Sequence, residues 1–437
     1  MKVLMFGWEF PPHISGGLGT ACFGLTKELS KLDVEITFVV PKLKGELSDA
    51  PVRLVGAKDI LNSGKIDNTQ NHVANTASSH LLKYIKINSS LRPYQNVEEY
   101  KNYVETIKGE DGSLQVKQNK SNLIDFSGDY GPDLMSEVVR YSWAGRELAQ
   151  KEQFDVIHAH EWMTFLAGIE AKKISNKPLV VHIHATEFDR SGENPNRDIY
   201  HLEKYGMEMA DKVIAVSKRT KNIIVHKYNI DPDKIEVVYN AVEKDDLSQI
   251  TQLGRARASR EKIVLFLGRI TMQKGPEYFL EAASNVLTQM PDVRFVMAGS
   301  GDMARKMVEK MATLRMVDRF HFTGFLKAPE RERLFAMSDL YIMPSVSEPF
   351  GITPLEAMKH GIPVIVSKQS GIAEILDNVV KVDFWDVPKL SQSIIDILNR
   401  PHLTDSMREN NRRTLESISW EHSACHVIDL YNQVIRL

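Results

Sequence analysis

Residues 338–365 are Ser338-Asp-Leu-Tyr-Ile-Met-Pro-Ser-Val-Ser-Glu348-Pro-Phe-Gly-Ile-Thr-Pro-Leu-Glu356-Ala-Met-Lys-His-Gly-Ile-Pro-Val-Ile365. The apolar run Asp339–Met343 predicts a buried strand, and Thr353 with Pro354 predicts the start of a helix after the loop. A second apolar run, Pro363–Ser367, predicts the next strand. This order of strand, helix and strand is typical of a parallel α/β sheet.

The same alternation extends over almost the whole chain. Short β-branched runs alternate with amphipathic stretches such as Pro276–Gln289 and Met303–Arg315, which predicts βα units. The strands predicted in the first half are Lys2–Phe6, Val34–Val40, Asp155–His158, Leu179–His184 and Lys212–Val216. Those predicted in the second half are Lys262–Leu267, Val293–Ala298, Arg319–Thr323, Asp339–Met343, Pro363–Ser367 and Val379–Val382. We therefore predict an α/β fold with two Rossmann-like sheets.

Two polar stretches without a clear period interrupt this pattern. Residues 243–261 are predicted to connect the two sheets, and residues 58–133 are predicted to form an insertion on the first domain. We assign residues 1–243 to the N-terminal domain and residues 244–419 to the C-terminal domain. The tail, 420–437, predicts a last helix whose buried face carries the apolar residues Cys425, Ile428, Leu430, Tyr431 and Val434.

The composition narrows the class of protein. A chain of 437 residues with 43% hydrophobic and 26% charged residues is typical of a soluble protein with two or three domains. Its net charge of −2 lacks the excess of positive charge that is typical of nucleic-acid-binding proteins. Two cysteines form neither a disulfide framework nor a metal-ligand spacing, which favours the cytoplasm. No run approaches the ~20 apolar residues of a spanning helix.

Four loops of the second half follow predicted strands and should meet at one edge of the sheet, where ligands of parallel sheets bind. Each carries glycine, a cation or a carboxylate. They are Gly268–Gly275, Gly299–Asp302, Gly324–Leu326 and Pro344–Gly351. This convergence is the strongest functional inference from the residues alone.

The loops contain what a diphosphate needs. Arg269 offers a planar fork of donors and Lys274 a mobile point charge. Gly351 and Ile352 precede the predicted helix, whose first backbone N–H groups would face an anion. The alternative for Arg269 and Lys274 is a solvated loop. Gly299 is also predicted to bind the donor.

Two carboxylates bracket the same helix start. Glu348 lies in the loop, and it can hold sugar hydroxyls or be solvated. Glu356 can do the same, but Thr353-Pro-Leu-Glu356 also matches a capping box, in which the glutamate caps the helix and needs no ligand.

The first half adds weaker signals. Gly16 and Gly17 lie in a glycine-rich turn before a predicted helix, which suits phosphate approach or a plain turn. His160 and His184 lie near strand ends and are predicted to be functional, whereas His158 and His182 are predicted to belong to the core. We predict no metal site, and the Asp231-Pro-Asp233 segment is predicted to be a turn.

With these residues in place, the chain resembles the retaining GT-B glycosyltransferases of the glycogen/starch synthase and group 1 type. The resemblance rests on residues 338–365, Ser370-Gly-Ile-Ala-Glu374, Leu267-Gly-Arg269 with Lys274-Gly, and Trp420-Glu421. It implies two Rossmann-like domains facing a cleft, with the C-terminal helix crossing back to the N-terminal domain.

The resemblance also implies residue roles. Arg269 and Lys274 would neutralise the donor diphosphate, which Gly351, Ile352 and Thr353 would bind at the helix start. Within the donor, Glu348 would contact the sugar, Glu356 the ribose, and Phe325 and Leu326 the nucleobase. Gly16 and Gly17 would contact the phosphate or the sugar. His184 would line the reacting face of the donor sugar, and His160 and Glu161 would contact the acceptor sugar.

The implied activity is hexosyl transfer from ADP-glucose or UDP-glucose without a metal or other cofactor, most closely glucan elongation. Ile14 stands where bacterial ADP-glucose starch synthases have lysine, and Trp8-Glu-Phe-Pro-Pro12 instead resembles archaeal-type glycogen synthases and group 1 transferases. The alternatives are another glycan or lipid-linked acceptor, a nucleotide-sugar epimerase, a glucan phosphorylase and a non-catalytic sugar- or nucleotide-binding protein.

Overall fold

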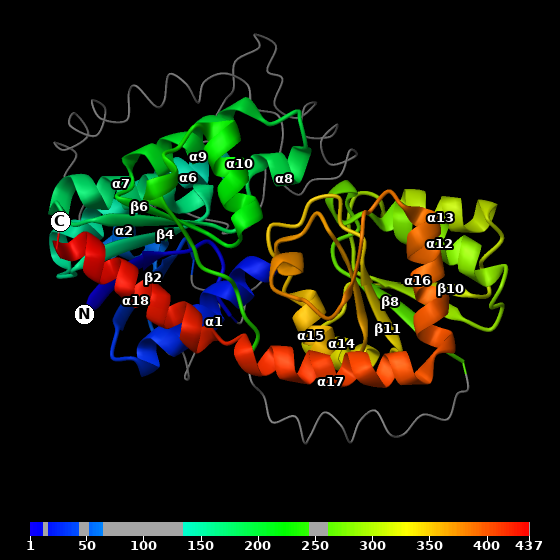
Figure 1. The fold of residues 1–437 in the computed structure, drawn as a ribbon. Coiled ribbons are helices and arrows are strands. Elements are labelled where there is room, and N and C mark those ends of the chain that lie inside the picture. Colours follow the sequence, from blue (N-terminus) through cyan, green and yellow to red (C-terminus); the bar gives the residue numbers. More distant parts are fainter. Residues whose placement is uncertain (12–15, 43–51, 64–133, 244–260, 437) are drawn as a thin grey trace, which may run out of the picture. The chain divides into compact units, whose positions relative to one another are not determined.

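The computed structural model describes residues 1–11, 16–42, 52–63, 134–243 and 261–436. The chain divides into two compact units (Figure 1). Unit 1 comprises Met1–Val216, Thr220–Val238 and Glu421–Leu437, and unit 2 comprises Ser217–Arg219 and Tyr239–Trp420. Most of the predicted insertion, from residue 64 to 133, lies outside the described residues, as do residues 244–260 of the predicted connection.

Unit 1 contains a seven-stranded sheet with the order β3-β2-β1-β4-β5-β6-β7, in which every pair is parallel. The strands are β1 (Lys2–Phe6), β2 (Glu35–Val40), β3 (Arg53–Gly56), β4 (Val156–His160), β5 (Leu179–Ile183), β6 (Lys212–Ala215) and β7 (Ile235–Val237). The sequence predicted five of them. It missed the edge strands β3 and β7.

Helices cover this sheet and include the C-terminal one. They are α1 (Gly17–Lys31), α2 (Ala57–Ser63), α6 (Leu134–Lys151), α7 (Trp162–Ser175), α8 (Glu187–Ser191), α9 (Arg197–Met209), α10 (Lys218–Tyr228), η2 (Pro232–Lys234) and α18 (Trp420–Arg436). Almost all of α18 belongs to unit 1, which confirms that the chain returns to the N-terminal domain (Figure 1).

The buried face of α18 differs from the predicted face at Cys425, and the predicted Ile428 is only partly buried. Leu430, Tyr431 and Val434 are buried as predicted. Cys425 is exposed, so its predicted place in the core was wrong. Successive helical residues are rotated by about 100°, and the preceding residue, Ala424, occupies the buried position instead.

Unit 2 contains a six-stranded parallel sheet with the order β10-β9-β8-β11-β12-β13. All six strands were predicted from the sequence. They are β8 (Ile263–Leu267), β9 (Arg294–Ala298), β10 (Phe320–Gly324), β11 (Leu340–Met343), β12 (Val364–Ser367) and β13 (Val380–Val382). The helices are η3 (Met272–Lys274), α12 (Pro276–Leu287), α13 (Ala304–Thr313), α14 (Ala328–Met337), α15 (Thr353–Lys359), η4 (Gly371–Glu374), α16 (Val387–Asn399) and α17 (Pro401–Ser417).

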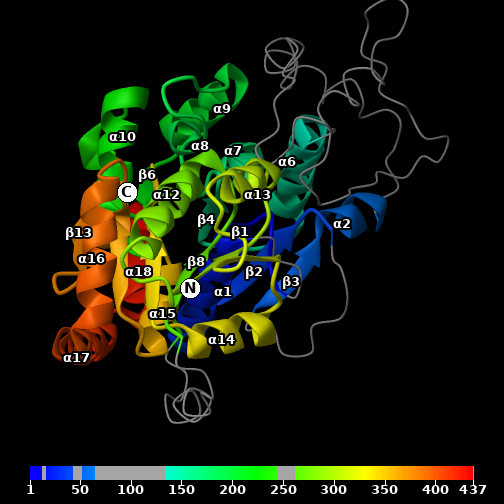
Figure 2. The same cartoon turned by 90° about the vertical axis from the view of Figure 1, so that its right-hand side faces the viewer.

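The strand orders fix where a ligand can bind in each sheet. The order reverses between β1 and β4 in unit 1 and between β8 and β11 in unit 2, and loops diverge to opposite faces at such a point. Strands β4 and β5 are buried at every position, as expected for parallel strands with helices on both faces (Figure 2). The loops after β1, β4, β8 and β11 are therefore the places to look for a site.

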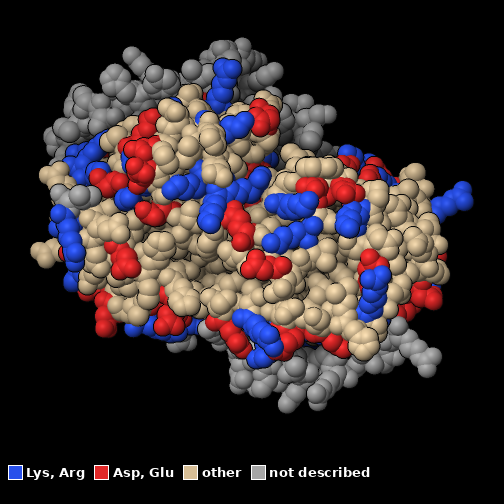
Figure 3. All heavy atoms as spheres, in the orientation of Figure 1, with Lys and Arg blue, Asp and Glu red and all other residues tan. Residues whose placement is uncertain are grey.

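The surface adds two observations. Basic and acidic side chains are interspersed over the face drawn in Figure 3. Among the helices of the described ranges, none combines the length and the apolar character needed to cross a membrane.

Candidate active site

The loops after β8 and β11 are joined in unit 2. The backbone N–H of Val346 donates to the Gln273 carbonyl at 2.9 Å, and Arg269 Nη2 donates to the Gln273 side chain at 3.2 Å. Lys274 Nζ donates to Glu348 Oε2 at 2.5 Å. These bonds bring together three residues that were predicted from two separate loops, Gly268–Gly275 and Pro344–Gly351. We call Arg269, Lys274 and Glu348 the donor-loop cluster.

Two glycines allow the loop backbones to approach one another. At Gly275, φ is +65°, and a Cβ atom would lie 2.1 Å from the Pro344 carbonyl oxygen. At Gly299, φ is +135°, and a Cβ atom would lie 1.9 Å from the Gly268 carbonyl oxygen. Any side chain would overlap a backbone oxygen at either position, and both φ values favour glycine. Packing by itself therefore explains why position 299 requires glycine. The predicted role of Gly299 in donor binding is not needed to explain it.

Glu348 is held firmly although it lies in a loop. Its side chain is buried and also accepts a hydrogen bond from Ser345 Oγ at 3.2 Å. Its backbone N–H donates to Gln369, and its carbonyl accepts from Gly371. A buried carboxylate requires a paired cation, which Lys274 supplies. The solvated-loop alternative for Glu348 is therefore wrong.

The start of α15 differs from the predicted capping box. The N-cap is Ile352, no side chain caps the helix, and Thr353 is already the first helical residue. The Thr353 hydroxyl is hydrogen-bonded to the Tyr341 phenol instead. Gly351, with φ of +105°, lets the chain turn into the helix.

Glu356 is consequently not a capping residue, because the residue three positions earlier is inside the helix. Its carboxylate lies 3.5 Å from Arg331 Nη2. Burial raises the pKa of the Glu356 carboxyl group, and the nearby Arg331 partly opposes this increase. The alternatives for Glu356 are now a ligand contact and an ion pair with Arg331.

Phe325 and Leu326 follow β10 at the neighbouring loop. The Gly299 N–H donates to the Gly324 carbonyl at 2.9 Å, which joins this loop to the one after β9. Phe325 is 67% exposed, an unusual state for a large aromatic side chain.

In unit 1, Gly16 and Gly17 form the start of α1. Both residues are exposed, and a Cβ atom at either position would meet nothing within 4 Å. Packing therefore does not require glycine at these two positions, in contrast to Gly299.

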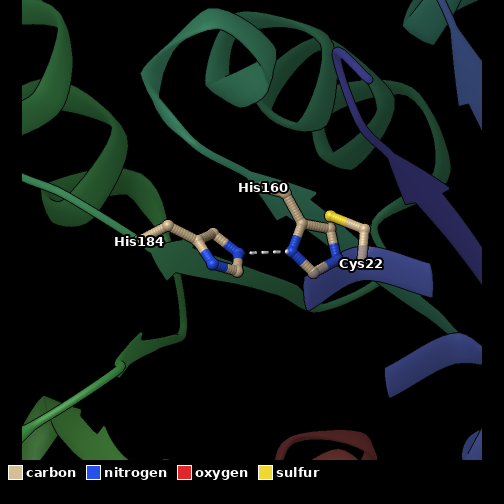
Figure 4. Close-up of side chains that lie close together, drawn as sticks. All are labelled: Cys22, His160 and His184. Carbon is tan, nitrogen blue, oxygen red and sulfur yellow. Dashed lines mark hydrogen bonds between the residues drawn. The ribbon is translucent and has the colours of Figure 1, made fainter. Parts of the chain in front are cut away.

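Four histidines at the ends of β4 and β5 form a compact array, the histidine cluster: His158, His160, His182 and His184. Within each strand the two rings are stacked, with centroids 4.2 Å apart. His160 Nδ1 and His184 Nε2 are 3.0 Å apart across the strands (Figure 4). His158 and His182 are core residues as predicted; His160 is equally buried, and only His184 is partly exposed.

Burial keeps the histidine cluster uncharged. Desolvation lowers the pKa of His158 and of His184 to about 3, and it lowers the pKa of His160 and His182 well below the usual value. Near neutral pH, His184 can therefore act through a neutral ring nitrogen but not as a cation.

The structure contradicts the acceptor role predicted for Glu161. This residue is buried, and its Oε1 accepts hydrogen bonds from the backbone N–H groups of His184 and Ala185 at 2.7 and 2.9 Å. Its Oε2 accepts from Arg190 Nη1 at 3.2 Å. Both oxygens are thus engaged in holding the loop after β5, so Glu161 positions His184 rather than contacting a sugar.

Arg190 was missed by the sequence analysis. It also pairs with Glu187 and Glu203, so one guanidinium joins three buried carboxyl groups. Burial raises the pKa of Glu203 to about 8, whereas Arg190 and the Tyr228 hydroxyl, which both donate hydrogen bonds to this carboxyl group, oppose the increase. No local sequence motif marks such a network, because its members come from three segments.

Comparisons with known proteins agree with this architecture. Residues 253–414 match the family model "Glycosyl transferases group 1", and residues 124–246 match "Glycosyltransferase Family 4". An uncharacterized glycosyltransferase of Methanocaldococcus jannaschii is 28% identical, over 99% of this chain and 98% of that protein. The alpha-maltose-1-phosphate synthase of Mycolicibacterium smegmatis is also 28% identical, over 65% of this chain and 80% of that protein.

Solved structures share the fold. Sucrose-phosphate synthase from Thermosynechococcus elongatus aligns over 100% of this chain and 99% of its own, with a TM-score of 0.71 and 17% identity. The catalytic domain of starch synthase IV from Arabidopsis thaliana, bound to ADP and acarbose, aligns over 100% and 99%, with a TM-score of 0.66 and 16% identity.

Two parallel α/β sheets and a C-terminal helix that returns to the first unit define a GT-B glycosyltransferase fold. The chain belongs to the group 1 glycosyltransferases and is a hexosyltransferase.

Proposed function

We propose that this protein transfers glucose from a nucleoside-diphosphate glucose to a carbohydrate acceptor with retention of the anomeric configuration, and that it elongates an α-1,4-glucan. The observation that carries the proposal is the donor-loop cluster. It places two cations and a fixed carboxylate at the carboxyl edge of the unit 2 sheet, beside the point where the strand order reverses.

The cluster suits a leaving diphosphate. Negative charge develops on the diphosphate as the bond to the sugar breaks, and Arg269 and Lys274 supply fixed positive charge there. Gly351, Ile352 and Thr353 would add backbone N–H donors at the start of α15. The diphosphate would then accept the proton of the incoming hydroxyl group, which attacks the face that the diphosphate leaves.

Donor binding would rearrange one ion pair. Lys274 now donates to Glu348, and a diphosphate would compete for the same ammonium group. Glu348 would be freed to accept hydrogen bonds from sugar hydroxyls, and Ser345 would continue to hold its carboxylate. Phe325 and Leu326 would contact the nucleobase, and Gly16 and Gly17 the phosphate or sugar.

The histidine cluster would act through His184. Its partial exposure and neutral ring suit a contact with the reacting sugar, while Glu161 holds its backbone. His160, linked to His184 by a hydrogen bond, would set the orientation of the His184 ring.

The acceptor has a second candidate. Alpha-maltose-1-phosphate synthase and starch synthase IV favour a glucan. Other relatives are named D-inositol 3-phosphate glycosyltransferase and UDP-Gal:alpha-D-GlcNAc-diphosphoundecaprenol alpha-1,3-galactosyltransferase, which favours a small phosphorylated or lipid-linked acceptor.

The test is a screen of the purified protein against ADP-, UDP- and GDP-sugars with glycogen, maltose, inositol phosphate and a lipid-linked sugar as acceptors. We expect transfer from ADP-glucose or UDP-glucose to glycogen or maltose, with an α-linked product by NMR. A β-linked product would overturn the retaining mechanism. Transfer only to inositol phosphate or lipid-linked sugar would overturn the glucan acceptor, and an isomerised donor without transfer would overturn the proposal as a whole.

Turnover is expected to survive excess EDTA. Arg269 and Lys274 provide the positive charge that a divalent cation supplies in other transferases, so chelation removes nothing that the transition state needs. Initial rates measured with and without EDTA should agree within about twofold. Loss of turnover on chelation that Mg²⁺ or Mn²⁺ restores would contradict this account of the donor-loop cluster.

Glu356→Gln is expected to lower kcat/KM for the donor at least ~10-fold with little change in melting temperature. Glutamine keeps one acceptor oxygen but loses the charge, and charge-assisted hydrogen bonds are about twice as strong as neutral ones. Steady-state kinetics with varied donor concentration measure the effect.

Arg331→Met is the matched control for Glu356, because it removes the partner of the ion pair and leaves the carboxylate. If Glu356 holds the ribose, the control variant should retain donor KM within a few-fold. Equal effects of the two substitutions would assign Glu356 to the ion pair with Arg331.

A further inference from the structure

The histidine cluster lies beside a buried cysteine from another part of the chain. Cys22 is on α1, and its sulfur is close to the rings of His160 and His184 (Figure 4). One donor atom from each of the three residues lies within 4.8 Å of the others. The cysteine is fully buried, and His184 is the partly exposed member of the group.

We propose that Cys22, His160 and His184 form a binding site for Zn²⁺ and similar thiophilic divalent ions, and that occupation of this site inhibits the transferase. The inhibition rests on the proposed role of His184, whereas the binding does not. The ion would be held by one thiolate and two imidazole nitrogens, a set of three protein ligands that leaves a fourth position open.

The nitrogen spacing already suits such an ion. Two nitrogens bound at 2.0–2.1 Å to a tetrahedral zinc ion are about 3.3 Å apart, and a zinc-bound sulfur and nitrogen are about 3.6 Å apart. His160 Nδ1 and His184 Nε2 are 3.0 Å apart. The sulfur must approach by at most about 1.2 Å from its limit of 4.8 Å, which a side-chain rotation can provide.

The protonation states of the three ligands differ. Burial lowers the pKa of His160 well below its usual value and that of His184 to about 3, so both rings are neutral and able to donate a lone pair. Burial also raises the pKa of the Cys22 thiol well above its usual value, so the thiol is protonated before an ion binds. Binding would release the thiol proton of Cys22, as metal binding by cysteine requires.

A second group of three histidines is a poorer candidate. His158, His160 and His182 also place ring nitrogens within 4.8 Å of one another. A metal ion must lie in the plane of each ring that binds it, but the rings of His158 and His160 are stacked, with centroids 4.2 Å apart and an angle of 21° between their planes. Two nearly parallel planes cannot meet at one ion near both nitrogens. The rings of His160 and His184 are tilted by 35° and face each other through ring nitrogens instead. The site with Cys22 is therefore favoured.

The experiment exploits the presence of only two cysteines in the chain. Cys425 is exposed, so Cys425→Ala removes the competing thiol. The Cys425→Ala protein, titrated with Co²⁺ as a spectroscopic substitute for Zn²⁺, should develop a thiolate-to-cobalt charge-transfer band with one equivalent of ion. Because Cys22 is then the sole cysteine, the band identifies the ligand even if Cys22→Ala does not fold. Absence of the band would overturn the proposal.

Cys22→Ala, with its fold checked by circular dichroism, should lack the band and bind Zn²⁺ at least ~10–100-fold more weakly. A loss of about this size follows even from substitutions of residues that only hold a metal ligand in place. Zn²⁺ should inhibit the wild type reversibly, EDTA should relieve the inhibition, and Cys22→Ala should require correspondingly more Zn²⁺. Equal binding by the wild type and Cys22→Ala would overturn the site. A band without inhibition would support the site and contradict the proposed role of His184.

Discussion

Arg269→Ala is expected to lower kcat/KM for glycosyl transfer by about 10²–10³-fold. The variant loses charge stabilisation of a developing anion, which is worth roughly 3–4 kcal/mol at a preorganised site. The melting temperature should change little, because the hydrogen bond to the Gln273 side chain is a modest contribution to stability. Steady-state kinetics with saturating acceptor and varied donor measure the loss.

Lys274→Ala is expected to lower the rate by a similar factor and, in addition, to lower stability. The substitution leaves the buried Glu348 carboxylate without its cation, which costs more than the loss of an exposed pair. In the double variant Lys274→Ala/Glu348→Gln the melting temperature should recover, because no buried charge is left without its partner. This recovery would show that the loss of stability comes from the unpaired carboxylate.

The exposed α13 residues Arg305 and Lys306 provide matched controls in the same unit. Arg305→Ala and Lys306→Ala remove the same charges from solvated positions and should retain turnover within about twofold. Near-normal rates for Arg269→Ala or Lys274→Ala as well would return that residue to the solvated-loop alternative.

Gly299→Ala is expected to destabilise unit 2 by about 3 kcal/mol or more. The methyl group would lie 1.9 Å from the Gly268 carbonyl oxygen, and φ of +135° is strained for alanine. Overlap and backbone strain each cost about 1–3 kcal/mol. For a unit of this size the melting temperature should fall by roughly 6–12 °C, measurable by calorimetry.

Gly268→Ala is the control for that effect. It adds the same methyl group to the facing loop, where a Cβ atom would meet nothing within 4 Å. Its melting temperature should remain within about 2 °C of the wild type, because surface substitutions usually change stability by less than ~0.5 kcal/mol. Similar losses for the two variants would show that the close approach at Gly299 is not what requires glycine.

Local pattern determined most of the fold. Strands buried on both faces give continuous apolar runs, so eleven of the thirteen strands in the described part of the chain and the parallel α/β class followed from periodicity. The loop order also predicted which catalytic candidates belong together: Glu348 is more than seventy residues from Arg269 and Lys274 in sequence, yet the two loops follow strands of one parallel sheet. The two loops converge because the carboxyl ends of parallel strands lie at the same edge of the sheet, and the strand pattern in the sequence already predicts this.

Tertiary structure decided what the individual side chains do. Thr353-Pro-Leu-Glu356 fits a capping box in sequence, but the helix already begins at Thr353, one residue too early for Thr353 to be the N-cap and Glu356 its partner. Glu161 resembles a sugar ligand, but the backbone of the loop after β5 occupies one of its oxygens and Arg190 the other.

The grouping of Cys22 with His160 and His184 also depends on tertiary structure, because α1 and the β4 and β5 ends are distant in sequence. The sequence determined the elements, since hydrophobic burial repeats with the local period of a helix or strand. Only the folded chain determined the partners of each polar group, since burial makes a donor or acceptor depend on whichever residue the packing places beside it.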